Sequence, residues 1–553
     1  MSIAAAVRDR TARVIPAGPP PPRLLDGLSV VAAAAPFWVV GVLYGLTGHL
    51  VWGGDQALVE LDAWDVRHLD QAVGSYSRMG WAHPGPVWTV LLTPLYWLFG
   101  SNGEALVAAS MILHGAFAAL VVVVAGTGAR WQRPLAALVV LGYVLRMPSI
   151  DFVGVWNPFA LLLPTALLLL LAARACAGSL PAAAAALAVG SLLVQTHVGT
   201  APLVGGVGAV VLVVLVVRGF RHRLARPGRR GWLETGLAGV AAVLMWVPPV
   251  WQQLRAAPGP GNLGLLAQDL LHGDPAAVTP TWRESVSTTG QLLGAPVYGW
   301  PAEPALVKAS VLTPAVVAAV VVQLLGCAVV AALAWRLRAA VPGWLAAVTG
   351  VATVAGLVSV KAITGPLMNY LVLWITVLPA VLLFAGVSLL ARWLASAPDR
   401  VPARFTGVTA SAAFAAAGTA LALLVAVVLA VSLHRSTDTQ LGDQPGAAEA
   451  SELAVDALPA AADDDPPVLL DIRDVSVWTT ATTVAVELTE AGHRVSVDDA
   501  WVYGFGADRR STGDEDWRVT LEPVSPGEGD LPGQVGVVQG AEGLIAVIVQ
   551  RTH

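Results

Sequence analysis

The stretch SVVAAAAPFWVVGVLYGLTGHLVWGGDQALVELDAWD, residues 29–65, joins the two features that decide the fold. Residues 29–50 are almost all apolar, and a run of about 20 such residues is long enough for a helix to cross the hydrocarbon core of a bilayer. Inside lipid, backbone polar groups must be satisfied within the segment, so this run is predicted to be helical. Acidic residues follow at once, beginning with Asp55. The stretch therefore predicts a spanning helix that ends at a charged loop.

The composition of the whole chain extends this prediction. Of 553 residues, 56% are hydrophobic and only 12% are charged, and the mean hydropathy is +0.69. A soluble protein carries about 25% charged residues. The first apolar run is too long for a cleaved signal peptide, so a retained first helix is expected. Cys176 and Cys327, both in apolar surroundings, argue against a disulfide framework or a cysteine-based metal cluster.

The distribution of arginines predicts how the chain is threaded through the membrane. Basic residues in short loops mark the cytoplasmic side, and the loop 218–230 holds six arginines. Placing this loop and the N-terminus inside requires that the short apolar segment Val87–Phe99 turns back without crossing. Eleven spans then result, at 29–50, 104–127, 134–148, 158–175, 180–197, 201–217, 232–250, 309–335, 341–360, 369–391 and 407–433.

This threading divides the chain into three parts. We expect a cytoplasmic tail at 1–28, an all-α polytopic membrane domain at 29–435 and a small extracytoplasmic α/β domain at 436–553. The membrane domain carries two large external loops, at 51–103 and 251–308, and the second has the length and Gly/Pro content of a lid or an acceptor contact. In the last domain, apolar patterns predict strands at 468–472, 494–497, 501–503, 517–521 and 544–549 and a helix at 477–491.

The first external loop resembles that of a known superfamily. Gly54-Asp55 is followed by Glu60, and the loop ends in YSRMGWAHPGP, residues 76–86, just before an apolar segment. An acidic residue after the first helix and a His-Pro element before the next resemble GT-C glycosyltransferases, in the branch of protein O-mannosyltransferases and lipid A aminoarabinose transferases. That branch has His-Pro-Pro where this chain has His83-Pro84-Gly85-Pro86. The stretches WNP at 156–158 and QTHVG at 195–199 are similar to uncharacterised GT-C-like proteins of high-GC bacteria.

The resemblance implies an inverting transfer of a sugar from a polyprenyl-phosphate donor, with mannose or arabinose as candidate sugars. Such a reaction needs a carboxylate base, donors that stabilise the leaving phosphate, and polar groups that orient the substrates. By its place in the family layout, Asp55 is expected to be the base. Glu60 is the alternative, and it could instead orient a partner or bind a metal. Arg78, His83 and Lys361 are the candidates for the leaving phosphate.

Further substrate-binding candidates are polar or aromatic residues at the external ends of spans, and most have a structural alternative. Asp55 or Asn157 could simply cap a helix. Lys361 could extend to the membrane interface, and His197 could be a buried histidine bonded to neighbouring helices. Asn369 and Tyr370 could belong to the interfacial aromatic belt. The candidates are Tyr76, Trp81, Trp156, Asn157, His197, Asn369 and Tyr370.

Absent motifs narrow the function further. The sequence has no Walker motif, no HExxH, no Cys/His metal spacing and no GxGxxG after a strand in its membrane part, which argues against an ATP-driven pump and a nucleotide-sugar enzyme. The resemblance thus implies a cell-membrane glycosyltransferase that acts outside the cell on an envelope glycan, glycolipid or protein. No cofactor and no nucleic-acid partner are expected, although a divalent cation would fit the chemistry. Two alternatives stay open: a transporter or flippase of lipid-linked sugars, and a membrane anchor for the C-terminal domain.

Overall fold

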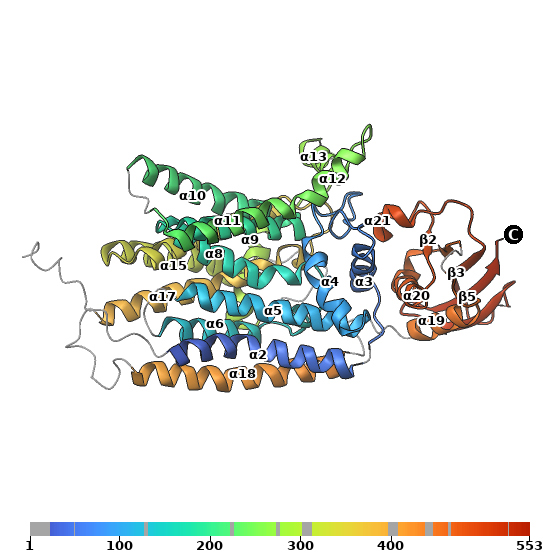
Figure 1. Cartoon of the computed structure of the whole chain (residues 1–553), viewed down its shortest axis with the longest axis horizontal. Helices are drawn as coiled ribbons and strands as arrows, with labels where there is room; N and C mark the ends of the chain where they lie inside the picture. Colours follow the sequence, from blue (N-terminus) through green and yellow to red (C-terminus); the bar gives the residue numbers. More distant parts are fainter. Residues whose placement is uncertain are drawn as a thin grey trace, which may run out of the picture.

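The chain folds into a long helical bundle with a mixed α/β domain packed against one of its ends (Figure 1). The computed structural model describes residues 23–48, 50–126, 131–221, 226–272, 277–300, 312–395, 408–436, 446–462, 466–528 and 530–552. Within these ranges, nine helical segments are long and apolar enough to cross a membrane. The protein is therefore a multi-pass membrane protein. The predicted tail at 1–22 lies outside the described residues.

Every predicted span coincides with a helix. The spans predicted at 134–148 and 180–197 form α6 (Gln132–Arg146) and α9 (Leu180–Thr196), which have 15 and 17 residues and are not among these nine segments. The nine long segments are α2 (Arg23–Thr47), α5 (Gly103–Ala125), η1 (Phe159–Leu161) with α8 (Leu162–Cys176), η2 (Val198–Thr200) with α10 (Ala201–Phe220), α11 (Arg229–Met245) with α12 (Val247–Arg255), α15 (Pro314–Arg336), α16 (Ala340–Lys361), η3 (Asn369–Val377) with α17 (Leu378–Ala395), and α18 (Val408–Ser436).

Burial separates a central helix from peripheral ones. In the 18-residue apolar stretch of Phe159–Cys176, 94% of the stretch is buried inside the protein. In the corresponding 18-residue stretch within Arg229–Arg255, only 11% is buried. Both are apolar on all sides, and a helix of that kind must be covered either by other helices or by lipid. Helix α8 therefore forms the centre of the bundle, and α11 lies at its lipid-facing edge.

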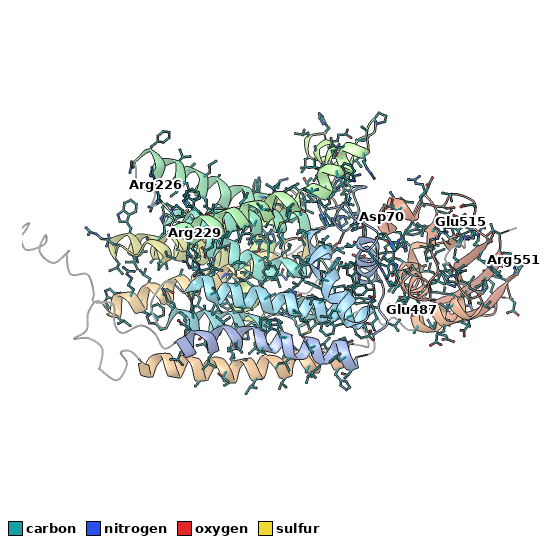
Figure 2. The ribbon with its side chains drawn as sticks, in the orientation of Figure 1. Asp70, Arg226, Arg229, Glu487, Glu515 and Arg551 are labelled. Atoms are coloured by element: carbon teal, nitrogen blue, oxygen red, sulfur yellow. The ribbon has the colours of Figure 1, made fainter. Side chains whose placement is uncertain are left out.

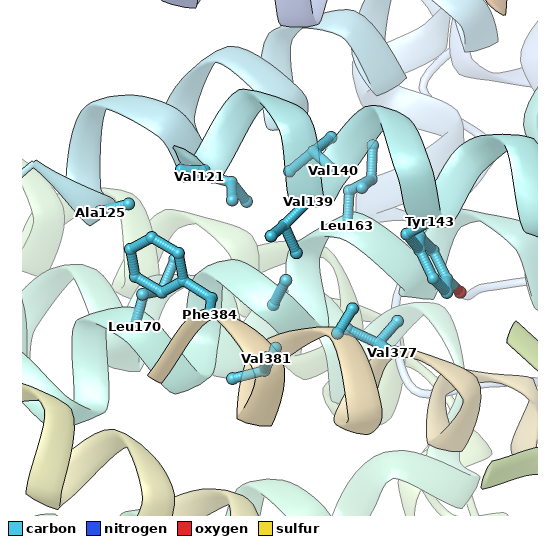
Figure 3. Close-up of a pocket in the computed structure, with 13 residues that line it drawn as sticks. Val121, Ala125, Val139, Val140, Tyr143, Leu163, Leu170, Val377, Val381 and Phe384 are labelled. Atoms are coloured by element: carbon cyan, nitrogen blue, oxygen red, sulfur yellow. The ribbon is translucent and has the colours of Figure 1, made fainter. Parts of the chain in front are cut away.

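The bundle interior contains a small apolar cavity between α5, α6, α8 and α17 (Figure 3). Its volume is about 40 Å³, and Val121, Val140 and Phe384 are among the side chains that line it. The hydroxyl of Tyr143 lies 2.7 Å from Thr376 Oγ1, so the polar atom at its edge is already paired. An apolar space of this size is a packing void and offers no partner to a polar substrate.

Helix α4 (Val87–Phe99) begins and ends at the same end of the bundle. Before it, the Gly85 N–H donates to the Gln195 carbonyl, at 3.3 Å, near the C-terminal end of α9. After it, Glu104 Oε1 accepts from the Leu50 N–H, at 2.6 Å, just beyond the end of α2. The helix has 13 residues, about 20 Å, against a hydrocarbon core of about 30 Å. The chain therefore turns back here, as the arginine pattern requires.

The arginine-rich loop lies at the other end of the bundle. Arg226 and Arg229 are far from Asp70 of the first loop and from the C-terminal domain (Figure 2). Arg174 belongs to the same end as the arginine-rich loop, where its Nη1 donates to the Val124 carbonyl at 2.8 Å. Arg130, Arg223, Arg400 and Arg404 lie outside the described residues. The charge asymmetry fits the predicted orientation, and the side of the membrane that each end faces stays a prediction.

The C-terminal domain is built on a five-stranded mixed sheet with the order β2-β1-β3-β5-β4. Strand β1 pairs in parallel with β2 and β3, whereas β5 pairs antiparallel with β3 and β4. The elements are α19 (Ala447–Asp456), β1 (Val468–Ile472), η6 (Val475–Val477), α20 (Trp478–Glu490), β2 (Val495–Val497), α21 (Val502–Phe505), η7 (Ala507–Arg509), β3 (Trp517–Val524), β4 (Gln534–Gln539) and β5 (Leu544–Arg551).

One strand prediction in this domain is wrong, and two elements were not predicted. The segment 501–503 leads into the short helix α21 instead of forming a strand. The Trp501 indole N–H donates to the Ile472 carbonyl at 2.9 Å, and its ring stacks on Trp478, so contacts with distant residues fix this segment. Helix α19 and strand β4, whose sequence QVGVVQ has a central glycine, gave no clear periodicity.

Candidate active site

A cavity of about 480 Å³ lies between the end of the bundle and the C-terminal domain. Pockets of this size hold small-molecule substrates. The first loop, the segments before α8 and α10, α13 (Asn262–His272), the segment after α16, and α21 all contribute to its wall. The lining residues are Asp55, Leu58, Val59, Asp62, Ser75, Tyr76, Ser77, Arg78, Met79, Trp81, His83, Trp156, Asn157, Pro158, His197, Val198, Gly199, Ala201, Pro202, Leu266, Asp269, Leu270, Ser359, Ala362, Ile363, Thr364, Tyr370, Leu371 and Gly504.

Two glycines place helix α3 (Asp55–Val66) directly against the C-terminal domain. A Cβ at Gly53 would lie 2.6 Å from the Thr479 carbonyl oxygen, so only glycine allows this approach of the two backbones. Gly54 has a φ of 66°, and its N–H donates to Thr482 Oγ1 at 2.6 Å. The Gly-Gly pair therefore docks the start of α3 on α20.

Asp55, the predicted base, points into the cavity and is held by two donors. Its Oδ1 accepts from the Tyr76 hydroxyl at 2.6 Å, and the side chain of Trp478 also bonds it. The N-cap residue of α3 is Gly54, and no side chain caps the helix, so the alternative of Asp55 as a capping residue does not describe its contacts. Burial raises the pKa of Asp55, while the bonds from Tyr76 and Trp478 act in the opposite direction.

Glu60, the alternative base, is buried behind the cavity and does not line it. Its Oε2 accepts from the Trp52 indole N–H at 2.6 Å, and its Oε1 accepts from the Tyr96 hydroxyl at 2.9 Å. Burial raises its pKa, and Glu490 of the C-terminal domain shares a hydrogen bond with it. Glu60 therefore ties α3 to α4 and α20, which leaves Asp55, of these two candidates, as the carboxylate that a substrate can reach.

The two cationic candidates for the leaving phosphate occupy different places. Arg78 lines the cavity, and its Nη2 donates to the carbonyls of Thr364 and Pro366 at 3.1 and 2.6 Å. These bonds fix the guanidinium through one nitrogen, and the group has further N–H donors to offer. Lys361 is not among the lining residues, and its Nζ lies 3.3 Å from Thr279 Oγ1. Of the two, Arg78 is the cation that faces the cavity.

The two candidate histidines meet in the cavity wall. The ring centroids of His83 and His197 are 4.4 Å apart. His83 Nδ1 accepts from the Val198 N–H at 3.3 Å, and His197 Nδ1 accepts from the Gly199 N–H at 3.1 Å. A neutral imidazole that accepts at Nδ1 carries its proton on Nε2, and burial lowers the pKa of His83, which favours that neutral form. Each ring therefore has an Nε2–H donor.

The aromatic and amide candidates come from three separate segments. Trp156 and Tyr370 line the cavity with ring centroids 4.4 Å apart, and the Trp81 indole N–H donates to Asp269 Oδ2 at 3.0 Å. Asn157 lines the cavity too, and its Nδ2 donates to the Thr196 carbonyl at 3.0 Å. Asn369 is buried and lies outside the lining. Nine of the twelve predicted site residues thus meet in one cavity; Glu60, Lys361 and Asn369 do not line it.

Sequence reasoning missed several lining residues. Asp62 lies on the same face of α3 as Asp55, and their spacing of seven residues was a signal that could have shown it. Burial raises the pKa of Asp62 to about 8, with a further contribution from Asp65. Gly504 and the neighbouring Trp478 come from the C-terminal domain, so no local pattern could have placed them here. Asp269, Leu266 and Leu270 come from α13, in the loop predicted as a lid.

A metal site finds no support among the described residues. In those parts of the chain, no group of three or more His, Cys, Asp or Glu side chains could hold a metal ion. Two aspartates of the cavity instead accept hydrogen bonds from aromatic side chains: Asp55 from the Tyr76 hydroxyl, and Asp269 from the Trp81 indole N–H. The cavity is best described by its carboxylates, its arginine and its aromatic rings.

The bundle, the α3 loop that lies across its end and the C-terminal α/β domain together share their fold with membrane proteins of known structure. One such structure is that of ArnT from Cupriavidus metallidurans, determined as a crystal structure bound to undecaprenyl phosphate. The TM-score is 0.53 and the sequence identity is 16%, with 94% of this chain and 97% of ArnT covered. No protein-family model and no curated protein matches the sequence. The fold predicted from the first loop is confirmed.

Proposed function

We propose that the protein is an inverting membrane glycosyltransferase that moves a sugar from a polyprenyl-phosphate donor to a hydroxyl group of a cell-envelope acceptor. The observation that carries this proposal is the position of Asp55, held by Tyr76 and Trp478 at the wall of a cavity that Arg78 also lines. A general base has to lie within hydrogen-bond reach of the proton that it removes. The likeness to ArnT, which binds undecaprenyl phosphate, supports a lipid-phosphate donor.

In the proposed reaction, Asp55 and Arg78 would have separate roles. The acceptor oxygen attacks the anomeric carbon and forms the new C–O bond, while Asp55 takes the hydroxyl proton. The bond between that carbon and the phosphate oxygen breaks, and the electron pair leaves with the polyprenyl phosphate. Arg78 stabilises the negative charge that develops there, because its fork of N–H donors suits phosphate oxygens. The raised pKa of Asp55 brings it closer to neutral pH and makes it a stronger base.

The apolar part of the cavity would take the start of the polyprenyl chain. Leu266 and Leu270 of α13 line it together with Leu371 and Met79. Leu270 is 69% exposed, so this wall opens toward the surface of the protein. A prenyl chain gains free energy when such side chains are removed from water, at about 25 cal/mol per Å² of apolar surface. The proposal thus accounts for both the polar and the apolar halves of the lining.

Replacing the base tests this function. Asp55→Asn keeps the size of the side chain and removes its basicity, so sugar transfer from polyprenyl-phosphoryl mannose or arabinose to an envelope extract should fall by about 10²- to 10⁴-fold. Binding of polyprenyl phosphate, measured on the purified full chain in nanodiscs, should stay unchanged. Asp70→Asn is the matched control, because Asp70 lies on the same loop but is exposed and outside the cavity.

Two outcomes would contradict the proposal. An Asp55→Asn variant with wild-type transfer would exclude Asp55 as the base. A wild-type protein that consumes neither donor, but moves the lipid-linked sugar between leaflets of a vesicle, would favour the transporter alternative. Because lipid binding is measured on the same purified protein, a loss of folding in the variant would be seen as a loss of lipid binding.

A further inference from the structure

The C-terminal domain is docked on the catalytic loop by polar contacts that are specific in position. Thr483 Oγ1 donates to the Trp52 carbonyl at 3.0 Å, next to the bond between Gly54 and Thr482. At the other end of α3, Arg509 Nη2 lies 2.7 Å from Asp65 Oδ1, and the Arg509 side chain is only 9% exposed. Because each contact satisfies a buried or half-buried polar group, the domain has one defined position over α3.

This position brings a set of aromatic rings to the edge of the cavity. The rings of Trp478 and Trp501 stack with centroids 5.5 Å apart, and Trp478 and Tyr503 are nearly parallel at 6.2 Å. A Cβ at Gly504 would lie 2.6 Å from the Trp478 ring, so glycine is what allows the Trp478 ring this close to the cavity wall. Tyr503 remains 45% exposed, and its ring lies 5.7 Å from that of Tyr76.

The aromatic set is on the side of Asp55 from which an acceptor must come. Tyr76, which contacts Tyr503, also donates the hydrogen bond to Asp55, while Arg78 is fixed against Thr364 and Pro366 of the bundle. In an inverting transfer, the attacking hydroxyl and the leaving phosphate lie on opposite sides of the anomeric carbon. With the phosphate at Arg78, the hydroxyl that Asp55 deprotonates has to lie toward the domain. Flat aromatic faces there suit the C–H groups of a sugar ring, and the Tyr503 hydroxyl suits its oxygens.

Resting on the proposed function, we propose that the C-terminal domain is the acceptor half of the active site. An acceptor sugar ring packs on Tyr503, beside Trp478, and presents its hydroxyl to Asp55. Trp478 is a positioning residue, since its bond orients the Asp55 carboxylate. The acceptor is accordingly a glycan or a glycolipid, and an unglycosylated protein segment is not expected to be a good substrate.

The test separates acceptor binding from donor turnover in the full chain. A panel of octyl glycosides, including octyl mannoside and octyl arabinoside, serves as acceptor probes. For Tyr503→Ala, we expect the KM for the accepted glycoside to rise roughly 3- to 10-fold, with a smaller change in kcat. Tyr503→Trp keeps an aromatic face and should restore the KM. Because Tyr503 is half-exposed, its removal should leave folding intact.

Trp478→Phe independently tests whether Trp478 positions Asp55. Losing the bond to Asp55 should lower kcat and move the acidic limb of the pH–rate profile to higher pH, a shift that a purely structural role would not produce. The proposal is overturned if no glycoside stimulates donor consumption, if a Ser/Thr peptide is accepted instead, or if Tyr503→Ala leaves the KM unchanged. Failure of the proposed function has a different signature, which is that the wild type does not consume the donor at all.

Discussion

At the scale of single residues, the two aspartates of α3 that face the cavity differ in their surroundings. Asp55 is bonded by Tyr76 and Trp478, whereas Asp62 lies beside the carboxylate of Asp65. Donors favour a charged carboxylate, while burial and a like charge favour the protonated form. One helix face therefore presents a carboxylate held by two donors near a carboxylic acid that stays protonated to a higher pH. The side chains are the same, and only their neighbours distinguish them.

The raised pKa of Asp62 predicts a pH-dependent stability. Its folded-state value of about 8 lies above the ordinary 3.8, so the folded protein keeps a proton that the unfolded chain releases. Stability should then fall as the pH rises between about 4 and 8. Asp62→Asn has no carboxyl group to titrate, so this loss of stability should disappear. Over the same rise in pH, the melting temperature of the variant, followed by tryptophan fluorescence in detergent, should therefore fall less than that of the wild type. Asp70→Asn should follow the wild type; parallel curves for all three proteins would refute the assignment.

At the scale of elements, the ion pair between Arg509 and Asp65 joins η7 to α3. Both side chains are largely buried, at 9% and 23% exposure, and burial raises the pKa of Asp65 even though Arg509 acts against it. The desolvation of such a pair offsets much of its attraction, so its presence does not by itself imply a large gain in stability. Its effect is on position, because either charge would be costly at this interface without the other.

This reasoning predicts a non-additive pair of substitutions. Arg509→Met alone should weaken docking by about 3 kcal/mol, because it leaves a buried carboxylate unpaired, whereas Arg509→Met combined with Asp65→Leu should recover most of that loss. The measurement is the rate at which a protease releases the C-terminal domain from the full chain. Arg510→Met is the neighbouring control, since Arg510 pairs with Asp499 inside the domain. Equal release rates for the single and double variants would show that the pair does not hold the interface.

At the scale of the whole molecule, the bundle has two chemically different ends. The cavity, α4 and the C-terminal domain lie at one end, and Arg226 and Arg229 lie at the other (Figure 2). Because arginine-rich loops are retained in the cytoplasm, this asymmetry predicts that the cavity faces the outside of the cell. A lipid-phosphate sugar in the outer leaflet would then reach the cavity from the side.

Cysteine labelling on intact cells checks this orientation. Cys176 and Cys327 are both buried, so the background should be low. Asp70→Cys, at an exposed position of the first loop, should react with a membrane-impermeant maleimide, and Arg226→Cys should react only after the membrane is opened. Labelling of position 226 from outside would reverse the orientation and place the cavity in the cytoplasm.

The sequence by itself determined which segments form the long apolar helices, and it predicted the chemistry of the first loop. The length of an apolar run indicates whether the segment can cross lipid, and every predicted span is indeed helical. The distribution of arginines among the loops indicates on which side each loop lies, which is why α4 was expected to turn back. Strands β1 and β5 and helix α20 were visible for the same reason, since their apolar patterns are local.

Only the tertiary structure decided which of these residues share a cavity. Glu60 and Asp55 are both acidic residues of one helix, yet packing buries Glu60 against Trp52 and turns Asp55 toward the cavity. Trp478 and Gly504 reach the same place from more than four hundred residues away, because α20 docks on Gly53 and Gly54. A local pattern records whether a side chain faces lipid, water or a core. Which distant side chain lies opposite it is set by the packing of whole elements, and no window of sequence contains that information.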